Sequence, residues 1–136
     1  MDRVDVADNN VHVVVVDYKT GDPSSDYNKQ KLKTCDEDKA GIGGDYWRQA
    51  MFYKILFDQD QLNKYEVSHA AYEFVEPNKK TKLLPPIHRF SFTSEHIEVV
   101  KAQIEMVWDK IQAHDFYTGC GEEKCEACNR SKHLKQ

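Results

Sequence analysis

The pattern of apolar and polar residues predicts a β-hairpin at the start of the chain. Residues 4–7 and 11–18 are rich in Val, which favours strands, and the polar segment 8–10 between them is typical of a turn. Its two Asn residues tolerate the positive φ that a two-residue hairpin loop requires. A hairpin with that loop places Asp2 directly opposite Asp17.

Two segments have the pattern of helices. Residues 46–57 are apolar on nearly all sides and predict a buried helix with Asp45 as its N-cap. Residues 94–114 predict an amphipathic helix that Thr93 or Ser94 can cap. The apolar stripe of this second helix contains Ile97, Val100, Ile104, Val107, Trp108 and Ile111.

Two further strands complete the predicted fold. Residues 65–75 and 87–93 read as strands, while 20–44 form a long polar loop that is partly helical around 27–33. The order β-β-α-β-β-α predicts the α/β (α+β) class, a mixed central β-sheet flanked by helices.

The composition is that of a globular protein. The chain has 136 residues, 40% of them hydrophobic and 31% charged, which suggests one domain with its own core. We divide it into a core at 1–118 and a Cys-rich tail at 119–136. No apolar run approaches a membrane span and no secretory signal is present, so we expect no membrane partner and a cytoplasmic location.

The charge pattern leaves nucleic-acid binding open. A net charge of −4 does not indicate a nucleic-acid partner, but nucleases combine acidic metal sites with local basic patches. Three such patches occur, although each is also what a solvated surface looks like. They are Lys29, Lys31 and Lys33; Lys79, Lys80 and Lys82; and Arg130, Lys132 and Lys135.

Several charged side chains lie close together at the end of the predicted hairpin. Directly opposed residues have Cβ atoms roughly 5 Å apart, so Asp2 and Asp17 would repel each other unless a divalent cation lay between them. The period of two puts Lys19 on the same face, and the backbone carbonyl of Tyr18 lies next to this site. Two carboxylates, a cation and an ammonium group suit phosphodiester hydrolysis. The alternative is a surface hairpin with an ordinary Asp–Lys ion pair.

Three motifs carry a family resemblance. "MDRVD", "VVVVDYKTG" and "RQAMFY" resemble, in this order, motifs of the PD-(D/E)XK nuclease superfamily, in particular its RecB-like branch, which includes AddB and domains fused to UvrD-like helicases. The resemblance implies that Asp2 and Asp17 are metal ligands and that Lys19 is the catalytic lysine. It also implies that Gln49 and Tyr53, which share a helix face, support the site; ordinary packing of a buried helix is the alternative.

The resemblance also implies a fold and a function. The expected fold is a restriction-endonuclease-like core that lacks its first helix. The expected activity is that of a Mg²⁺- or Mn²⁺-dependent deoxyribonuclease, an exonuclease, working in DNA recombination or repair. DNA and a helicase domain, on the same chain or on a partner, are the expected partners. The family's upstream helix and the Gly before its first motif are missing, so we expect weak activity from this chain alone.

Three of the four cysteines lie near the C-terminus. Cys120, Cys125 and Cys128 can supply three ligands of a tetrahedral Zn²⁺ site, with His133 or Cys35 as a fourth. The resemblance implies another option, a [4Fe-4S] cluster whose fourth cysteine lies in the absent upstream segment. Three free thiols are the simplest alternative.

Two other functions compete with the nuclease. One is a catalytically inactive relative that only binds DNA or docks a helicase, and the other is a small zinc-binding interaction module. Because Asp2, Asp17 and Lys19 are all present, the sequence favours the nuclease. The remaining polar groups are assigned no role in the chemistry. His69, His88, His96 and His114 are assigned to strands or the surface, and Asp36, Glu37 and Asp38 to solvent.

Overall fold

A computed structural model describes residues 1–8, 11–60, 64–78, 81–115, 120 and 125–133. These form two compact units, residues 1–100 and 101–136, and each is described by itself below. The division falls inside a helix, and the sequence-based division at residue 118 stays a prediction. None of the described helices is long and apolar enough to cross a membrane.

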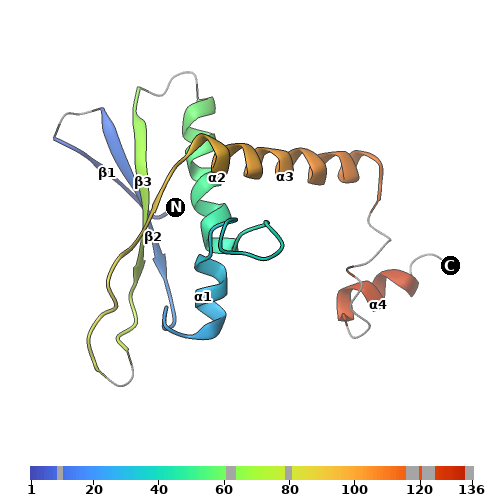
Figure 1. Cartoon of the computed structure of the whole chain (residues 1–136), viewed down its shortest axis with the longest axis horizontal. Helices are drawn as coiled ribbons and strands as arrows, with labels where there is room; N and C mark the ends of the chain where they lie inside the picture. The colour runs from blue at the N-terminus through green and yellow to red at the C-terminus, as the bar shows by residue number, and fades with distance from the viewer. Residues whose placement is uncertain (9–10, 61–63, 79–80, 116–119, 121–124, 134–136) are drawn as a thin grey trace. The chain divides into compact units, whose positions relative to one another are not determined.

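The first unit is built on a mixed four-stranded sheet with strand order β1-β2-β3-β4 (Figure 1). The expected fold class is confirmed, because β1 pairs antiparallel with β2, β2 parallel with β3, and β3 antiparallel with β4. The strands are β1 (Arg3–Val6), β2 (His12–Lys19), β3 (Glu66–Phe74) and β4 (His88–Ser91). Helices α1 (Asp26–Leu32) and α2 (Asp45–Gln59) follow β2.

The predicted hairpin register is confirmed. Arg3 pairs with Val16 and Val6 with Val13, which places Asp2 opposite Asp17. The backbone N–H of Asp2 continues the ladder by donating to the Val16 carbonyl at 3.0 Å. The alternation of side chains along the two strands is consistent with this register, while the predicted loop at residues 9–10 lies outside the described residues.

The core lies between the sheet and α2. One cluster of buried side chains joins Val13 and Val15 of β2 to Tyr53 and Val67. A larger cluster surrounds Trp47, Met51 and Tyr72, each fully buried. Because β2 contributes buried Val residues up to Val16, its polar end is held rigidly by the apolar part of the strand.

Two expectations about α2 are wrong. The N-cap is Gly44, not Asp45; Asp45 lies in the first turn and pairs with Arg48. A Cβ on Gly44 would lie 2.3 Å from two backbone carbonyl oxygens of α1, so only glycine allows this close approach. The helix is also not buried on all sides, since Phe52 and Leu56 are exposed.

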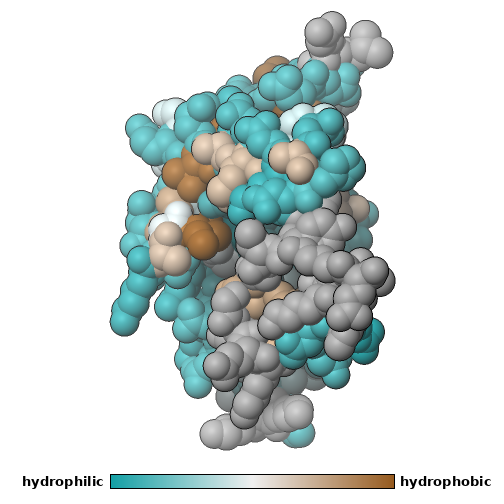
Figure 2. Space-filling model, turned by 90° about the vertical axis from the view of Figure 1, so that its right-hand side faces the viewer, coloured by the Kyte–Doolittle hydropathy of each residue, from teal (hydrophilic) through white to brown (hydrophobic). Residues whose placement is uncertain are grey.

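Helix α3 (Ser94–Gln112) begins in the first unit and ends in the second. The predicted cap is confirmed at Thr93, whose Oγ1 accepts from the backbone N–H of His96 at 3.1 Å. Val100 is buried, but the later residues of the apolar stripe are exposed. These are Ile104, Val107, Trp108 and Ile111. Figure 2 shows apolar side chains lying at the surface among hydrophilic ones.

The second unit holds the rest of α3 and the short helix α4 (Glu126–His133). The three tail cysteines, Cys120, Cys125 and Cys128, lie close together near the start of α4. They form one of the two groups of possible metal ligands found among the described residues.

Candidate active site

The end of β2 positions the site. Side chains alternate along the strand, so Val15, Asp17 and Lys19 face the same side of the sheet, where Val15 packs against Tyr53 of α2. Asp17 is only 4% exposed, and such a burial requires partners for its charge.

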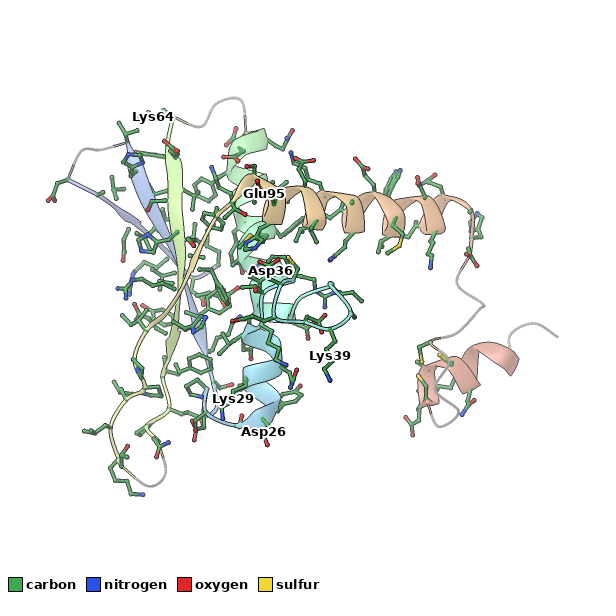
Figure 3. The ribbon with its side chains drawn as sticks, viewed as in Figure 1. Asp26, Lys29, Asp36, Lys39, Lys64 and Glu95 are labelled. Atoms are coloured by element: carbon green, nitrogen blue, oxygen red, sulfur yellow. The ribbon has the colours of Figure 1, made fainter. Side chains whose placement is uncertain are left out.

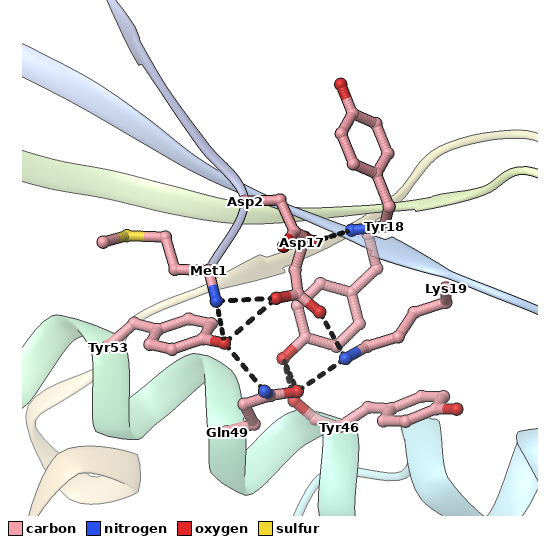
Figure 4. A network of polar contacts seen from close by, with 9 residues as sticks. Met1, Asp2, Asp17, Tyr18, Lys19, Tyr46, Gln49 and Tyr53 are labelled. Atoms are coloured by element: carbon pink, nitrogen blue, oxygen red, sulfur yellow. Dashed lines mark hydrogen bonds and ion pairs between the residues drawn. The ribbon is translucent and has the colours of Figure 1, made fainter.

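Asp17 has three close partners (Figure 4). The Tyr53 hydroxyl donates to its Oδ1 at 3.0 Å, and the N-terminal ammonium of Met1 lies 2.9 Å from the same oxygen. The Lys19 ammonium pairs with its Oδ2. Burial alone would raise the pKa of Asp17, but the hydrogen bonds from Lys19, the Met1 ammonium and Tyr53 outweigh burial and lower it. The carboxylate is therefore ionised at neutral pH.

A chain of hydrogen bonds runs from Lys19 back to Asp17. Lys19 Nζ donates to Gln49 Oε1 at 2.7 Å, and Gln49 Nε2 donates to the Tyr53 hydroxyl oxygen at 2.7 Å. Tyr53 then donates to Asp17. Gln49 and Tyr53 lie one turn apart on α2, as their spacing predicts, so one helix face holds both charged groups of β2 in place.

Two aromatic residues that the sequence did not single out surround Lys19. Its Nζ lies 4.6 Å from the ring centroid of Tyr46 and 4.8 Å from that of Tyr72, both within cation–π range. The Tyr72 hydroxyl donates to the Tyr46 carbonyl at 2.7 Å and to Gln49 Oε1 at 3.2 Å. Tyr72 pairs with Asp17 across the parallel β2–β3 ladder, and only that long-range pairing could have identified it.

Asp2 approaches the same strand end from β1. Its Oδ2 accepts from the backbone N–H of Tyr18 at 2.8 Å, while the Tyr18 side chain lies on the other face with the Arg3 guanidinium. Burial, the hydrogen bond to Asp17 and the negative charges of Asp17 and Asp2 all raise the pKa of Tyr53. The structure thus brings together Asp2, Asp17, Lys19, Gln49 and Tyr53, all five of the residues expected here.

The donor set suits a hard divalent cation. Asp17 is ionised and already attracts two ammonium groups, and Asp2 reaches the same strand end from the opposed strand. Among the described residues, no third Asp, Glu, His or Cys groups with this pair. Such a set fits an ion like Mg²⁺, which keeps several waters and binds through one or two carboxylates. The Tyr18 carbonyl remains a predicted further ligand.

The tail cysteines also lie together. Cys120, Cys125 and Cys128 place their sulfur atoms within 4.8 Å of one another, and Cys128 Sγ lies 3.4 Å from Cys120 Sγ. Hydrogen bonds from the Cys128 backbone and from the neighbouring thiols lower the pKa of Cys125 to about 7. Three thiols with one partly ionised near neutral pH can bind a soft metal ion. The side chain of His133, one predicted fourth ligand, lies outside the described residues.

Cys35, the other predicted fourth ligand, has different neighbours. It is buried in the core of the first unit and groups with Asp36 and His96. The assignment of His96 to the surface is wrong, because its side chain is only 15% exposed and its ring packs edge-on against Trp47. Asp36 is exposed as expected, but it pairs with His96 rather than with solvent alone.

Comparison with known proteins gives one match. The family model of the PD-(D/E)XK nuclease superfamily matches residues 1–132. No curated protein and no solved structure matches the chain.

Proposed function

Because this chain belongs to the PD-(D/E)XK nuclease superfamily, we propose that it is a metal-dependent deoxyribonuclease with its active site at the end of β2. Asp2 and Asp17 are the proposed metal ligands, and Lys19 is the proposed catalytic lysine. Gln49 and Tyr53 are positioning residues in this proposal. The observation that carries it is the hydrogen-bonded chain Lys19–Gln49–Tyr53–Asp17, which holds a lysine and a buried carboxylate in one fixed arrangement.

Each residue has a distinct chemical role. A divalent cation held by Asp2 and Asp17, with the Tyr18 carbonyl beside them, would polarise the scissile phosphate and lower the pKa of a bound water. Lys19 would orient the attacking water and stabilise negative charge on the phosphate. Gln49 fixes the direction of the Lys19 side chain, and Tyr53 keeps Asp17 ionised by donating to it.

Basic side chains near this site support DNA as the substrate. The ring centroid of Tyr46 lies 4.6 Å from Lys19 Nζ and 5.0 Å from Lys31 Nζ of α1. This one aromatic ring therefore lies between the proposed active site and the basic patch that contains Lys31. A groove of about 590 Å³ lies beside α1. Its lining includes Pro23, Lys29, Lys33, Ile87 and His88. Lysines along one side of an apolar groove can contact phosphates while bases lie on the apolar surface.

The finer parts of the proposal rest on the sequence motifs. We propose Mg²⁺ or Mn²⁺ as the cation, exonuclease action, and a role in recombination or repair with a helicase domain on this chain or a partner. For the tail we propose a metal site at Cys120, Cys125 and Cys128, either Zn²⁺ or a [4Fe-4S] cluster whose further ligand comes from elsewhere. The close grouping of the three sulfur atoms supports this part.

One observation favours a second candidate function, a catalytically inactive module that binds DNA or docks a helicase. Both oxygens of Asp17 are already engaged, Oδ1 by the Tyr53 hydroxyl and Oδ2 by the Lys19 ammonium. A cation that binds Asp17 competes with the Lys19 ammonium for this carboxylate. If the cation does not displace that ammonium, the chain would keep its DNA-binding surface and lose the chemistry.

Cleavage of end-labelled linear DNA tests the proposal. The chain is incubated with Mg²⁺ or Mn²⁺, beside a Lys19→Ala variant and a Lys39→Ala variant as a matched control, since Lys39 is exposed on a loop away from this network. Cleavage that requires the metal, survives in Lys39→Ala and is lost in Lys19→Ala supports the nuclease. DNA binding without cleavage by the unsubstituted chain supports the inactive module. Cleavage that Lys19→Ala leaves unchanged contradicts the assignment of Lys19.

A further inference from the structure

Outside the proposed active site, a second group of metal-ligating side chains lies within the first unit. Cys35 and Asp36 follow α1, and His96 lies in the first turn of α3. One ligand atom from each residue lies within 4.8 Å of the other two. Figure 3 shows Asp36 on the loop that follows α1, close to the start of α3, where Glu95 is labelled.

The three side chains already contact one another through their ligand atoms. His96 Nε2 lies 2.8 Å from Asp36 Oδ2, and Cys35 Sγ lies 3.8 Å from Asp36 Oδ1. A tetrahedral Zn²⁺ with bonds of about 2.0–2.3 Å separates its ligand atoms by roughly 3.3–3.7 Å. The group therefore needs only small side-chain movements to surround such an ion.

The burial of the group suits a site that is open on one side. Cys35 is buried and the His96 side chain is 15% exposed, whereas the Asp36 side chain is 76% exposed. A metal bound here would have protein on the side of Cys35 and His96 and water on the side of Asp36. Three protein ligands with one open position is the arrangement of Zn²⁺ sites that accept water or another ligand.

The surroundings of the group are rigid. His96 packs edge-on against Trp47, with ring centroids 5.3 Å apart, and the Thr93 cap fixes the backbone beside it. The loop that carries Cys35 and Asp36 is closed by Asp38, whose Oδ2 accepts from Ile42 N and Gly43 N at 3.1 Å each. Preformed ligand positions lower the cost of ordering a site when the ion binds.

One polar atom in the group has no partner. His96 Nδ1 is buried and has no hydrogen-bond partner among the residues that the structure describes. A buried polar atom without a partner costs free energy, whichever ring nitrogen carries the proton. The Asp36–His96 contact, which uses Nε2, therefore leaves the ring only partly satisfied.

From these contacts we propose that Cys35, Asp36 and His96 form a binding site for Zn²⁺. The bound ion would join the loop after α1 to the start of α3. The mixed sulfur, nitrogen and oxygen donor set suits this borderline-soft ion better than Mg²⁺. Binding converts the Cys35 thiol into a thiolate, and the proton leaves to solvent. The site is separate from the carboxylates of Asp2 and Asp17 and does not rest on the proposed nuclease function.

Co²⁺ binding to a full-length variant tests the site. Replacing the tail cysteines by Cys120→Ser, Cys125→Ser and Cys128→Ser leaves Cys35 as the only thiol. Co²⁺ bound through a thiolate gives a sulfur-to-metal charge-transfer band, which carboxylate ligands cannot give. An excess of Mg²⁺ keeps hard carboxylate sites filled during the titration. We expect this band at one equivalent of Co²⁺, and its loss when Zn²⁺ is added.

Single substitutions in that background assign the ligands. His96→Asn and Asp36→Asn should each weaken Zn²⁺ binding at least tenfold, while His69→Asn and Asp26→Asn serve as matched controls without effect. Because Asp36 is exposed, its substitution leaves the fold intact, which circular dichroism checks. Absence of the charge-transfer band in the folded chain overturns the proposal. Equal Zn²⁺ affinity in the His96 and Asp36 variants and in their controls overturns it as well.

Discussion

Removing the Tyr53 hydroxyl tests how the site holds its carboxylate. Tyr53→Phe deletes a donor that lies 3.0 Å from Asp17 Oδ1, and both side chains are nearly buried. A hydrogen bond to a charged group contributes about 1.5–3 kcal/mol. Without it the pKa of Asp17 rises towards its ordinary value, because one of the three groups that lower the pKa is gone. We therefore expect a loss of about 2 kcal/mol in unfolding free energy at pH 7.

The loss of stability should depend on pH, because it involves the charge of Asp17. A carboxyl group with a lowered pKa in the folded state contributes stability above its unfolded pKa, and the contribution disappears as the pH falls through the folded value. For Asp17 the ordinary value is 3.8, so the effect of Tyr53→Phe is full at pH 7 and decreases below about pH 4. Below that range only a neutral hydrogen bond, of about 1 kcal/mol, is left to lose.

Urea unfolding at a series of pH values measures this effect. A loss of about 2 kcal/mol moves the unfolding midpoint by about 1 M for a protein of this size. Tyr27→Phe is the matched control, because Tyr27 is 71% exposed and its substitution should change stability by less than about 0.5 kcal/mol. A Tyr53→Phe loss that stays equal from pH 7 to about pH 2, well below the ordinary Asp17 pKa of 3.8, refutes the reasoning, since Asp17 would then not sense the hydroxyl through its charge.

Three further predictions follow from single groups. Asp17→Ala should abolish Mg²⁺ binding at the end of β2, and isothermal calorimetry that finds unchanged affinity refutes the ligand assignment. Gly44→Ala should lower the unfolding free energy by about 1–3 kcal/mol, because the added Cβ would lie 2.3 Å from two backbone oxygens. A thermal melt that shows no loss of stability contradicts this. Cys125 should react with iodoacetamide faster than the buried Cys35, with a rate that falls as the pH drops below about 7. Peptide mapping that finds Cys35 modified first contradicts this order.

The sequence by itself determined the features that depend on near neighbours. The register that sets Asp2 opposite Asp17 was predicted from the alternation along two short strands and from the turn residues between them. Gln49 and Tyr53 share a face because helix geometry requires it. The Thr93 cap is likewise a contact within one turn. Such features depend on backbone geometry over a few residues, so they can be predicted from the sequence alone.

Only the tertiary structure decided features that depend on distant segments. Tyr72 reaches Lys19 because β3 pairs parallel with β2, and no local pattern gives the partner or direction of that pairing. His96 is half-buried against Trp47 and faces Asp36, although the three belong to different segments of the chain. The N-cap of α2 is Gly44, where the backbone of α1 approaches too closely for any side chain. In each case the deciding force is steric or electrostatic contact between segments that only the folded chain brings together.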